Sequence, residues 1–353
     1  MAARAAAAGA AMTGAAAALG VAWASFVWPM AWQASVIGLV ALGLQRVLGR
    51  WSTTAGLMVA GAGLLKFAVP PYVRVPFALA DRVAAGLFVA PDERLAAAVA
   101  SLAVLHLAGA VAALALVAVR ARGVRRWRLD GEPVSDGGLL DAYRHAASAL
   151  GWAPGRALPR LLWGAAVDSP VAIGVWRPAV LVPRGFERLP RGVAGLALAH
   201  ELAHHRRHDL AVEWGLVLLT AAWWWHPVVH GLARAVRALR ELRADGDVVG
   251  SGLADAGEYC AALLAVARSE QRPLALAAGT GAGHPLKARM RRLLDLSPPS
   301  RRVRRAAVAA AWVFVITALP AATGRWRPPS GPVRQVTVEQ HVIKDSIVVV
   351  DIR

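Results

Sequence analysis

Long apolar stretches without charged side chains constrain this chain of 353 residues more than any other feature. Residues 5–45 carry no formal charge, and further uncharged runs cover residues 95–119 and 306–324. A helix needs about 20 apolar residues to cross a bilayer. Clusters of arginine follow residue 119 and precede residue 306, which is typical of membrane segments with a cytoplasmic flank. The chain is therefore expected to be embedded in a membrane.

The composition favours the same class of protein. Hydrophobic residues make up 57% of the chain and charged residues 18%, whereas soluble domains average about 45–50% and about 25%. The net charge of +18 comes mostly from arginines beside apolar runs, which fits loops facing anionic lipid. No nucleic-acid motif accompanies the charge, so no direct contact with nucleic acid is expected. The single cysteine, Cys260, excludes an intramolecular disulfide and a cysteine-based zinc cluster.

Four transmembrane helices are expected. They lie at about residues 26–45, 51–69 and 95–119, which form a three-helix membrane region (26–119), and at residues 306–324. The positive-inside rule places their arginine clusters in the cytoplasm and both termini outside the cell, in a multi-pass protein of the cell membrane. The Ala-rich residues 1–25 are compatible with a signal peptide, an extra helix or a disordered segment. Residues 325–353 would form a short extracytoplasmic tail with one or two strands.

Residues 120–305 would form a cytoplasmic domain that mixes helices and strands. Apolar periodicity predicts helices at Gly137–Leu150, Leu196–Arg207, Asp255–Arg268 and Leu286–Leu294. Short apolar runs between glycines and prolines predict strands at Leu161–Val167, Val171–Val175 and Ala179–Val182. The run from 171 to 182 could present an edge to which an extended peptide adds as a strand, or it could be plain core sheet.

The motif His200-Glu201-Leu202-Ala203-His204 lies within this domain. Two histidines four residues apart lie on the same face of a helix. That spacing suits two imidazole ligands on one zinc ion, with Glu201 able to act on a bound water. Structural histidines and a surface carboxylate are the alternative interpretation. Because the pattern is short, its meaning depends on a third ligand.

Glu241 is the preferred third ligand. It lies in a helical segment in which Asp245 follows one turn later on the same face. Glu241 would bind the metal, and Asp245 would accept the outer N–H of a ligand histidine. His208 is the main competitor, but three ligands four apart on one straight helix cannot converge on one ion. A solvated ion pair is the alternative for Glu241, and the role of Asp209 beside the motif is open.

A helical hairpin over residues 210–248 is expected to bring Glu241 to the motif. Residues 214–233 carry no formal charge and could be a fifth span, which would put the two parts of the site on opposite sides of the bilayer. His226-Pro227 interrupts this run. Two helices meeting there would rise and return by roughly 21–24 Å. The tip, Trp223–Trp225, would be buried, re-entrant or at the membrane interface.

At these positions the chain resembles the M56 family of membrane zinc metallopeptidases, which includes the β-lactam sensor-transducers. The resemblance covers most of the chain and is carried by LLKFAVPP (64–71), SPVAIG (169–174), RPAVLVP (177–183), HELAHHRRHD (200–209), the aromatic-His-Pro turn (225–227) and Arg240-Glu241. It implies a mainly α multi-pass membrane protein with four transmembrane helices. An α+β, gluzincin-like zinc metallopeptidase domain would be inserted between the third and the fourth.

The resemblance also implies Zn²⁺ as the cofactor, His200, His204 and Glu241 as its ligands, and Glu201 as the catalytic base. Ala244 stands where members often carry cysteine, so that cysteine is not essential for zinc binding. The sensor-transducers carry a large penicillin-binding domain after the last span. Only residues 325–353 follow it here, so direct β-lactam sensing is not implied.

The expected function is that of a zinc metalloendopeptidase in transmembrane signalling. Its substrates would be the protein itself, a cytoplasmic regulatory protein such as a transcriptional repressor, or both. The expected partners are this protein substrate and the lipid bilayer, and a homodimer is compatible with the sequence. The alternatives are an M48-like membrane quality-control protease and a non-catalytic transmembrane signalling partner with a structural zinc site. The intact Glu201 argues against a structural site.

Overall fold

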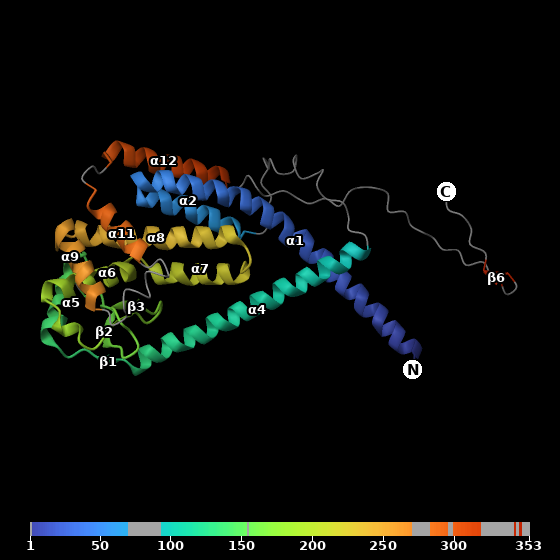
Figure 1. The fold of residues 1–353 in the computed structure, drawn as a ribbon, viewed down its shortest axis with the longest axis horizontal. Coiled ribbons are helices and arrows are strands. Elements are labelled where there is room, and N and C mark those ends of the chain that lie inside the picture. The colour runs from blue at the N-terminus through green and yellow to red at the C-terminus, as the bar shows by residue number, and fades with distance from the viewer. Residues whose placement is uncertain are drawn as a thin grey trace.

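The computed structural model describes residues 2–69, 93–153, 155–269, 283–295 and 299–318, with two short strands, β5 (Val342–Ile343) and β6 (Ser346–Ile347). Most of these residues are helical. Figure 1 shows long helices that run side by side, with a small sheet near one of their ends. The predicted combination of long helices and a small sheet is confirmed.

One long helix forms the start of the chain. Helix α1 (Ala2–Trp51) runs without a break through the expected first span. Ser52 separates it from helix α2 (Thr53–Lys66) and caps α2, because its side chain accepts a hydrogen bond from Ala55 N at 3.3 Å. Gly56 in α2 lies so close to Gly49 in α1 that an added Cβ would be 3.0 Å from the Gly49 Cα. The Ala-rich residues from 2 to 25 are thus part of the first long helix.

Helix α4 (Glu93–Asp130) contains the third expected span and continues through the arginine cluster. Its large apolar side chains are exposed, among them Leu102, Val104, Leu105, Leu107, Val111, Leu116 and Val119. A continuous apolar helix surface of this kind does not suit contact with water. It suits contact with lipid, because a helix satisfies its own backbone hydrogen bonds.

Two of the four expected spans have full length in the structure. Among the described residues, Met30–Trp51 in α1 and Ala98–Asp130 in α4 are long and apolar enough to cross a membrane. Helix α2 has 14 residues and so covers about 21 Å, short of a hydrocarbon core of about 30 Å. Helix α12 (Arg301–Ala318) begins with its arginines. The end of the fourth expected span lies outside the described residues, so four full spans are not confirmed.

Helices α7 (Asp209–Ala222) and α8 (Pro227–Gly250) form a hairpin that lies beside α1 and α2 (Figure 1). Residues of α8 share one buried core with α1, α2 and α12, including Val229, Leu232, Ala233 and Val236. At the tip, His226 Nε2 lies 2.9 Å from Ser35 Oγ in α1. The hairpin therefore extends alongside the expected first span. The sequence left open whether its tip is buried, re-entrant or at the membrane interface.

A four-stranded sheet of order β1-β2-β4-β3 lies against the motif helix. Its strands are β1 (Glu132–Pro133), β2 (Arg160–Trp163), β3 (Val171–Ile173) and β4 (Ala179–Val182). Strands β2 and β4 are parallel, and the outer strands pair antiparallel to them. Three strands occur where the sequence predicts them, and β1 was not predicted. Among the described residues, strand β3 pairs with another strand on one side only, so its other edge is unpaired there.

A second core positions the motif helix. Helices α5 (Gly137–Ala149), α6 (Arg191–Arg206) and α9 (Ala256–Ser269) pack with one face of the sheet. Asp136 starts α5 by accepting a hydrogen bond from Leu139 N at 2.7 Å. A short 3-10 helix, η1 (Phe186–Arg188), leads from β4 into α6. All these helices except η1 fall where the apolar periodicity predicts helices, with ends that shift by a few residues.

Helix α11 (Gly283–Leu293) connects the two cores. Its Arg292 donates a hydrogen bond to the Gly49 carbonyl at 3.1 Å and another to the Arg50 carbonyl, at the end of α1. Its Arg289, one turn earlier, donates to Asp245 on α8. One short helix thus contacts both the end of a long membrane helix and the region of the predicted site.

Candidate metal centre and active-site cleft

Helix α6 fixes the two histidines of the motif. Leu198, Ala199 and Leu202 are fully buried in the second core, and the face of the helix that carries the motif histidines is directed toward α8. His200 and His204 lie one turn apart on that face, and their Nε2 atoms are 3.2 Å apart. Both rings are buried, with 8% of each residue exposed.

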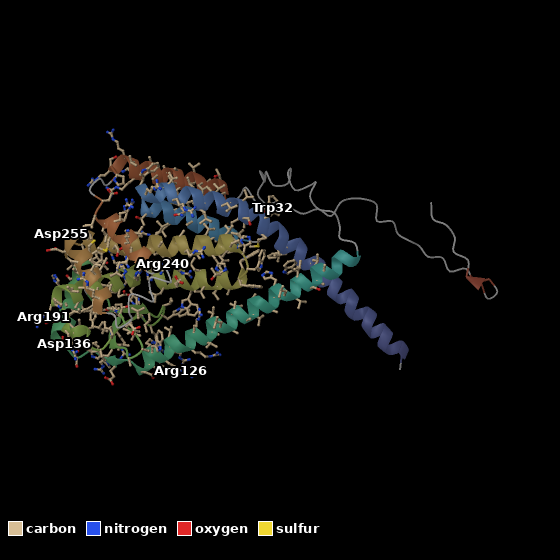
Figure 2. All side chains as sticks on the ribbon, in the orientation of Figure 1. Trp32, Arg126, Asp136, Arg191, Arg240 and Asp255 are labelled. Atoms are coloured by element: carbon tan, nitrogen blue, oxygen red, sulfur yellow. The ribbon has the colours of Figure 1, made fainter. Side chains whose placement is uncertain are left out.

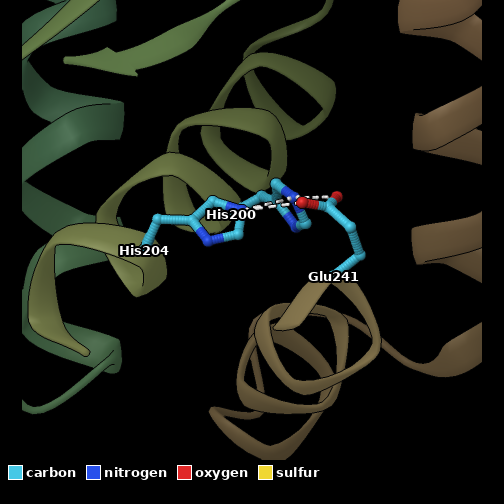
Figure 3. Close-up of side chains that lie close together, drawn as sticks. All are labelled: His200, His204 and Glu241. Atoms are coloured by element: carbon cyan, nitrogen blue, oxygen red, sulfur yellow. Dashed lines mark hydrogen bonds and ion pairs between the residues drawn. The ribbon is translucent and has the colours of Figure 1, made fainter. Parts of the chain in front are cut away.

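Glu241 on α8 completes a triangle with the two histidines (Figure 3). Its Oε2 lies 3.4 Å from His200 Nε2, and its Oε1 lies 3.4 Å from His204 Nε2. A tetrahedral zinc ion with bonds of about 2.0–2.1 Å places its ligand atoms about 3.3 Å apart. The closest pairs of donor atoms therefore have the spacing that one zinc ion requires, and one ligand atom from each side chain lies within 4.8 Å of the other two.

Asp209 holds the outer nitrogen of His204. The His204 Nδ1 lies 2.8 Å from Asp209 Oδ2, and both groups are buried. Because a carboxylate can only accept, the Nδ1 carries the hydrogen. The chain reaches this geometry through His208, whose left-handed backbone (φ 57°) separates α6 from α7 and returns the next residue toward the motif. The Nε2 of His204 is therefore the nitrogen on the side of Glu241 that could bind a metal ion.

Asp245, Tyr259 and Arg289 hold the outer side of His200. The His200 Nδ1 lies 3.2 Å from Asp245 Oδ1 and 2.9 Å from the Tyr259 hydroxyl. The hydroxyl donates to Asp245 Oδ1 at 2.9 Å, so it accepts from His200. Arg289 donates to both oxygens of Asp245, at 2.6 and 2.8 Å. With its Nδ1 hydrogen held on this side, the neutral ring of His200 would present the Nε2 lone pair to a metal ion, as a metal ligand requires.

A positive charge would stabilise the arrangement of His200, His204 and Glu241. Two imidazole lone pairs and a carboxylate converge there, and groups of this kind repel one another unless a cation or a proton lies between them. Burial opposes ionisation of Glu241, but His200, His204 and Arg289 lower its pKa to about 2. Burial likewise opposes a charge on His200, but Asp245 and Glu241 raise its pKa to about 9. The residues present thus fit a bound divalent cation.

Glu201 lies beside this triangle and faces the open strand. Its Oε2 accepts a hydrogen bond from the Ala172 N–H of β3 at 2.6 Å. Burial raises the pKa of Glu201, although the neighbouring imidazoles and this hydrogen bond act in the opposite direction. A carboxylate with a raised pKa is suited to receive a proton and release it again.

A cleft of about 900 Å³ opens onto the site. Its lining includes His200, Glu201, His204 and Glu241, the run Val171–Arg177, residues of α7, and the last turns of α4. The site is therefore buried on the side of its histidines and accessible on the side of Glu201. A peptide chain could reach Glu201 along β3 without moving the second core.

The remaining histidines near the motif lie outside the triangle. His205 Nε2 is 2.9 Å from the Ala179 carbonyl, which ties α6 to β4. His208 forms the turn before α7, and His226 stands at the hairpin tip with Ser35. The structure therefore gathers His200, His204 and Glu241, and leaves His208 in the turn.

Three residues of the site were not assigned from the sequence. The role of Asp209 was open, because a straight helix from His204 would have directed it elsewhere. Tyr259 and Arg289 come from α9 and α11, which lie far from the motif in sequence. The signal for Asp209 was its position directly after a charged run that could end the helix. No local pattern marks Tyr259 or Arg289.

Taken together, the buried donor triangle, the adjacent carboxylate and the cleft define a candidate metal-dependent hydrolase site. The model of the M56 peptidase family, described as BlaR1 peptidase M56, matches residues 77–293, more than half of the chain. This chain belongs to the M56 peptidase family, as its sequence motifs predicted.

The chain is also similar to a curated relative, the regulatory protein BlaR1 of Bacillus licheniformis. The two are 29% identical over 79 residues, which is 22% of this chain. The match spans 13% of the length of that relative. The similarity supports the family assignment and does not extend to the whole relative.

Proposed function

We propose that this chain is a membrane-embedded, zinc-dependent endopeptidase that cleaves itself, a cytoplasmic regulatory protein, or both, in transmembrane signalling. The observation that carries the proposal is the triangle of ligand atoms at His200, His204 and Glu241, with Glu201 on the cleft side. Family membership supplies the reaction class, peptide hydrolysis.

Glu201 would act as general base and then as general acid. Bound zinc would supply a Lewis acid that polarises the scissile carbonyl and lowers the pKa of water. Glu201 would accept the proton of the attacking water and pass it to the leaving amine. Its raised pKa favours the first transfer, because it makes the carboxylate a stronger base. Asp209 and Asp245 would keep the two histidines in the tautomer that leaves Nε2 free.

The open edge of β3 would align the substrate. Val171 and Ile173 face Leu181 and Ala179 of β4 in an antiparallel ladder. The residue between them, Ala172, directs its N–H to Glu201 and thus away from β4. In such a ladder the N–H and the carbonyl of one residue point the same way. Ala172 therefore directs both groups to the unpaired edge, where its carbonyl is available to an extended peptide and its N–H is held by the proposed base.

The proposed membrane arrangement is multi-pass, with the active site on the cytoplasmic side. The exposed apolar surface of α4 supports contact with lipid, and the arginines at its end support a cytoplasmic location for the cleft. The contact between Ser35 and His226 supports a re-entrant hairpin, because Ser35 lies within the first span. Both termini would then be extracytoplasmic.

The other two functions proposed from the sequence have less support. A structural zinc site needs no carboxylate facing a cleft, yet Glu201 faces one. The family match is to M56, which argues against the M48-like alternative. Regulated proteolysis therefore explains more of the observations than a quality-control protease or an inactive signalling partner.

The decisive experiment compares wild type with Glu201→Gln, using the full chain with zinc in lipid nanodiscs. Fragments of the protein itself and of candidate cytoplasmic regulators are identified by mass spectrometry. Removal of a general base costs about 10²–10⁴-fold in rate, so the variant should leave the substrates intact while its zinc content stays unchanged. Glu258→Gln, a change to an exposed carboxylate on α9, is the matched control. Equal fragment patterns for wild type and Glu201→Gln would contradict the proposal.

A further inference from the structure

Helix α4 presents a row of arginines to the cleft. The α4 residues that line the cleft are Val117, Arg120, Ala121, Val124, Arg125, Trp127 and Arg128. At about 100° per residue they fall within one arc of about 160° on the helix surface. Arg120, Arg125 and Arg128 within this arc are termed the α4 basic stripe. It forms a wall of the cleft that belongs to a different element from the metal site.

The same helix carries two arginines on its other side. Arg122 and Arg126 lie about 140–180° around the helix from Val117, and neither lines the cleft. Figure 2 labels Arg126 at the edge of the molecule, beyond the α4 ribbon. The arginines after the membrane segment therefore form two sets with different surroundings, although they lie within one short stretch of sequence.

The α4 basic stripe has no acidic partner in the described part of the chain. Neither Arg120, Arg125 and Arg128, nor Arg177 at the end of the β3 loop, forms an ion pair among the described residues. Arg240, the fifth arginine of the cleft, differs, because Glu213 accepts its hydrogen bond at 2.8 Å. Four positive charges thus line the cleft without a counter-charge from these residues.

The carboxylates that line the cleft are already engaged. Glu213 accepts from Arg237 and Arg240. Glu241 belongs to the donor triangle and also lies 3.3 Å from Arg289. Glu201 accepts from the backbone of β3. None of these groups can move to neutralise the stripe without dismantling the site, so the described part of the cleft keeps an excess of positive charge that an anionic ligand would match.

Anionic lipid is the other source of negative charge, and the geometry favours a peptide. Arg122 and Arg126 already offer headgroup contacts on the outer side of α4. The stripe instead alternates with Val117, Ala121 and Val124 along a cleft whose lining also includes Glu201. A peptide with acidic side chains between apolar ones matches this pattern. Arginine binds carboxylates through two parallel hydrogen bonds, which also fixes the orientation of the peptide.

We infer that the α4 basic stripe determines specificity, by binding aspartate and glutamate side chains of the substrate close to the scissile bond. This inference rests on the proposed peptidase function and adds the substrate class to it. The apolar residues of the cleft would accept the neighbouring side chains. Substrates with lysine or arginine at the same positions would be excluded by like charge.

Binding tests the inference without turnover. The Glu201→Gln protein, in zinc-loaded nanodiscs of neutral phosphatidylcholine, is titrated with fluorescent peptides that differ only in Glu, Gln or Lys at alternate positions. Arg125→Gln/Arg128→Gln should lose about tenfold in affinity for the Glu peptide and little for the Gln peptide, as expected for two partly exposed charge pairs. Arg122→Gln/Arg126→Gln is the matched control and should bind as the parent does.

Cleavage distinguishes failure of this inference from failure of the proposed function. Digests of a peptide library by the otherwise unmodified protein should show Asp and Glu enriched around the cleaved bonds, and the stripe variant should lose the enrichment. Cleavage with no acidic enrichment would overturn the inference alone. An equal loss in the stripe and control variants would assign the arginines to the membrane and overturn it as well. Equal digests by wild type and Glu201→Gln would overturn the proposed function itself.

Discussion

The two walls of the cleft are built in opposite ways. On the metal wall, formed by α6 and α8, each ligand histidine has its outer nitrogen fixed by a carboxylate, and Asp245 is fully buried with bonds to three partners. On the α4 wall, the arginines reach into the cleft without partners among the described residues. The metal wall is determined by its internal hydrogen bonds, whereas the α4 wall is not.

This difference separates chemistry from selectivity. A ligand set works only if its atoms are held within a few tenths of an ångström, so it requires support from residues around it. A wall that is free of such bonds can change its side chains without disturbing the fold. Substitutions on the two walls should therefore have effects of different kind and size.

The largest effect is expected from Glu241→Ala on the metal wall. The variant keeps two histidine ligands but lacks the third, so the zinc content of the purified protein should fall from about one ion to near zero, and peptidase activity should be lost with it. Elemental analysis after dialysis measures the content. Glu187→Ala, an exposed carboxylate outside the cleft, is the control. Unchanged stoichiometry and affinity would remove Glu241 from the ligand set.

A smaller effect is expected from the carboxylates behind the histidines. Asp245→Asn and Asp209→Asn should each weaken zinc binding by about 10–100-fold. Asp245→Asn should lie at the upper end, because it also leaves Arg289 without its buried partner. Competition with a chromophoric chelator gives the affinities. The opposite ranking would show that the Tyr259 and Arg289 contacts do not support the site.

The ion pairs of Glu213 predict a pH effect on stability. Burial favours the neutral acid, but Arg237 and Arg240 keep the pKa of Glu213 below its ordinary value of 4.5. A depressed folded-state pKa stabilises the fold above the unfolded-state pKa, and this contribution disappears as the pH falls through the folded value. Glu213→Gln should therefore lower the thermal midpoint at pH 7, and the difference should shrink as the pH falls through the folded-state pKa and vanish below it. A difference that does not shrink at any acidic pH would contradict this assignment.

The smallest effect is expected from the α4 wall. Arg125→Gln and Arg128→Gln remove charges that make no ion pair among the described residues, so the thermal midpoint should stay within the error of the measurement, as for most surface substitutions. A marked loss of stability would mean that the stripe belongs to the fold, and the contrast between the walls would fail. Differential scanning fluorimetry in nanodiscs is sufficient for this comparison.

The sequence predicted the three candidate metal ligands better than the residues that hold them in place. The HExxH spacing and the break at His226-Pro227 were enough to bring Glu241 near the motif, because both depend on helix geometry alone. Asp209 was open, because its position depends on the left-handed backbone of His208, a conformation that residues other than glycine rarely adopt. Tyr259 and Arg289 depend on how α9 and α11 pack, which no local pattern encodes.

In the membrane region, the sequence located the long helices but not their ends or their neighbours. Hydropathy located α1 and α4 correctly, but it could not show that α1 continues from Ala2 or that α2 ends at Lys66. Hydropathy also could not place the hairpin beside α1. Small residues such as Ala34 and Ala41 share one buried core with α2 and α8, and hydropathy does not distinguish a helix face that packs against other helices from one that contacts lipid.

Helix α11 contacts both the end of α1 and the residues behind the metal site, so the free energies of these two contacts are coupled. Arg289 and Arg292 lie three residues apart, so a shift of the helix that breaks one set of contacts strains the other. Linkage is reciprocal for binding free energies. If zinc binding depends on Arg289, the contact between α11 and the end of α1 strengthens zinc binding by some factor. Bound zinc then strengthens that contact by the same factor. A signal that moves α1 in the membrane would then change the zinc affinity of the site, and zinc binding would in turn favour one position of α1.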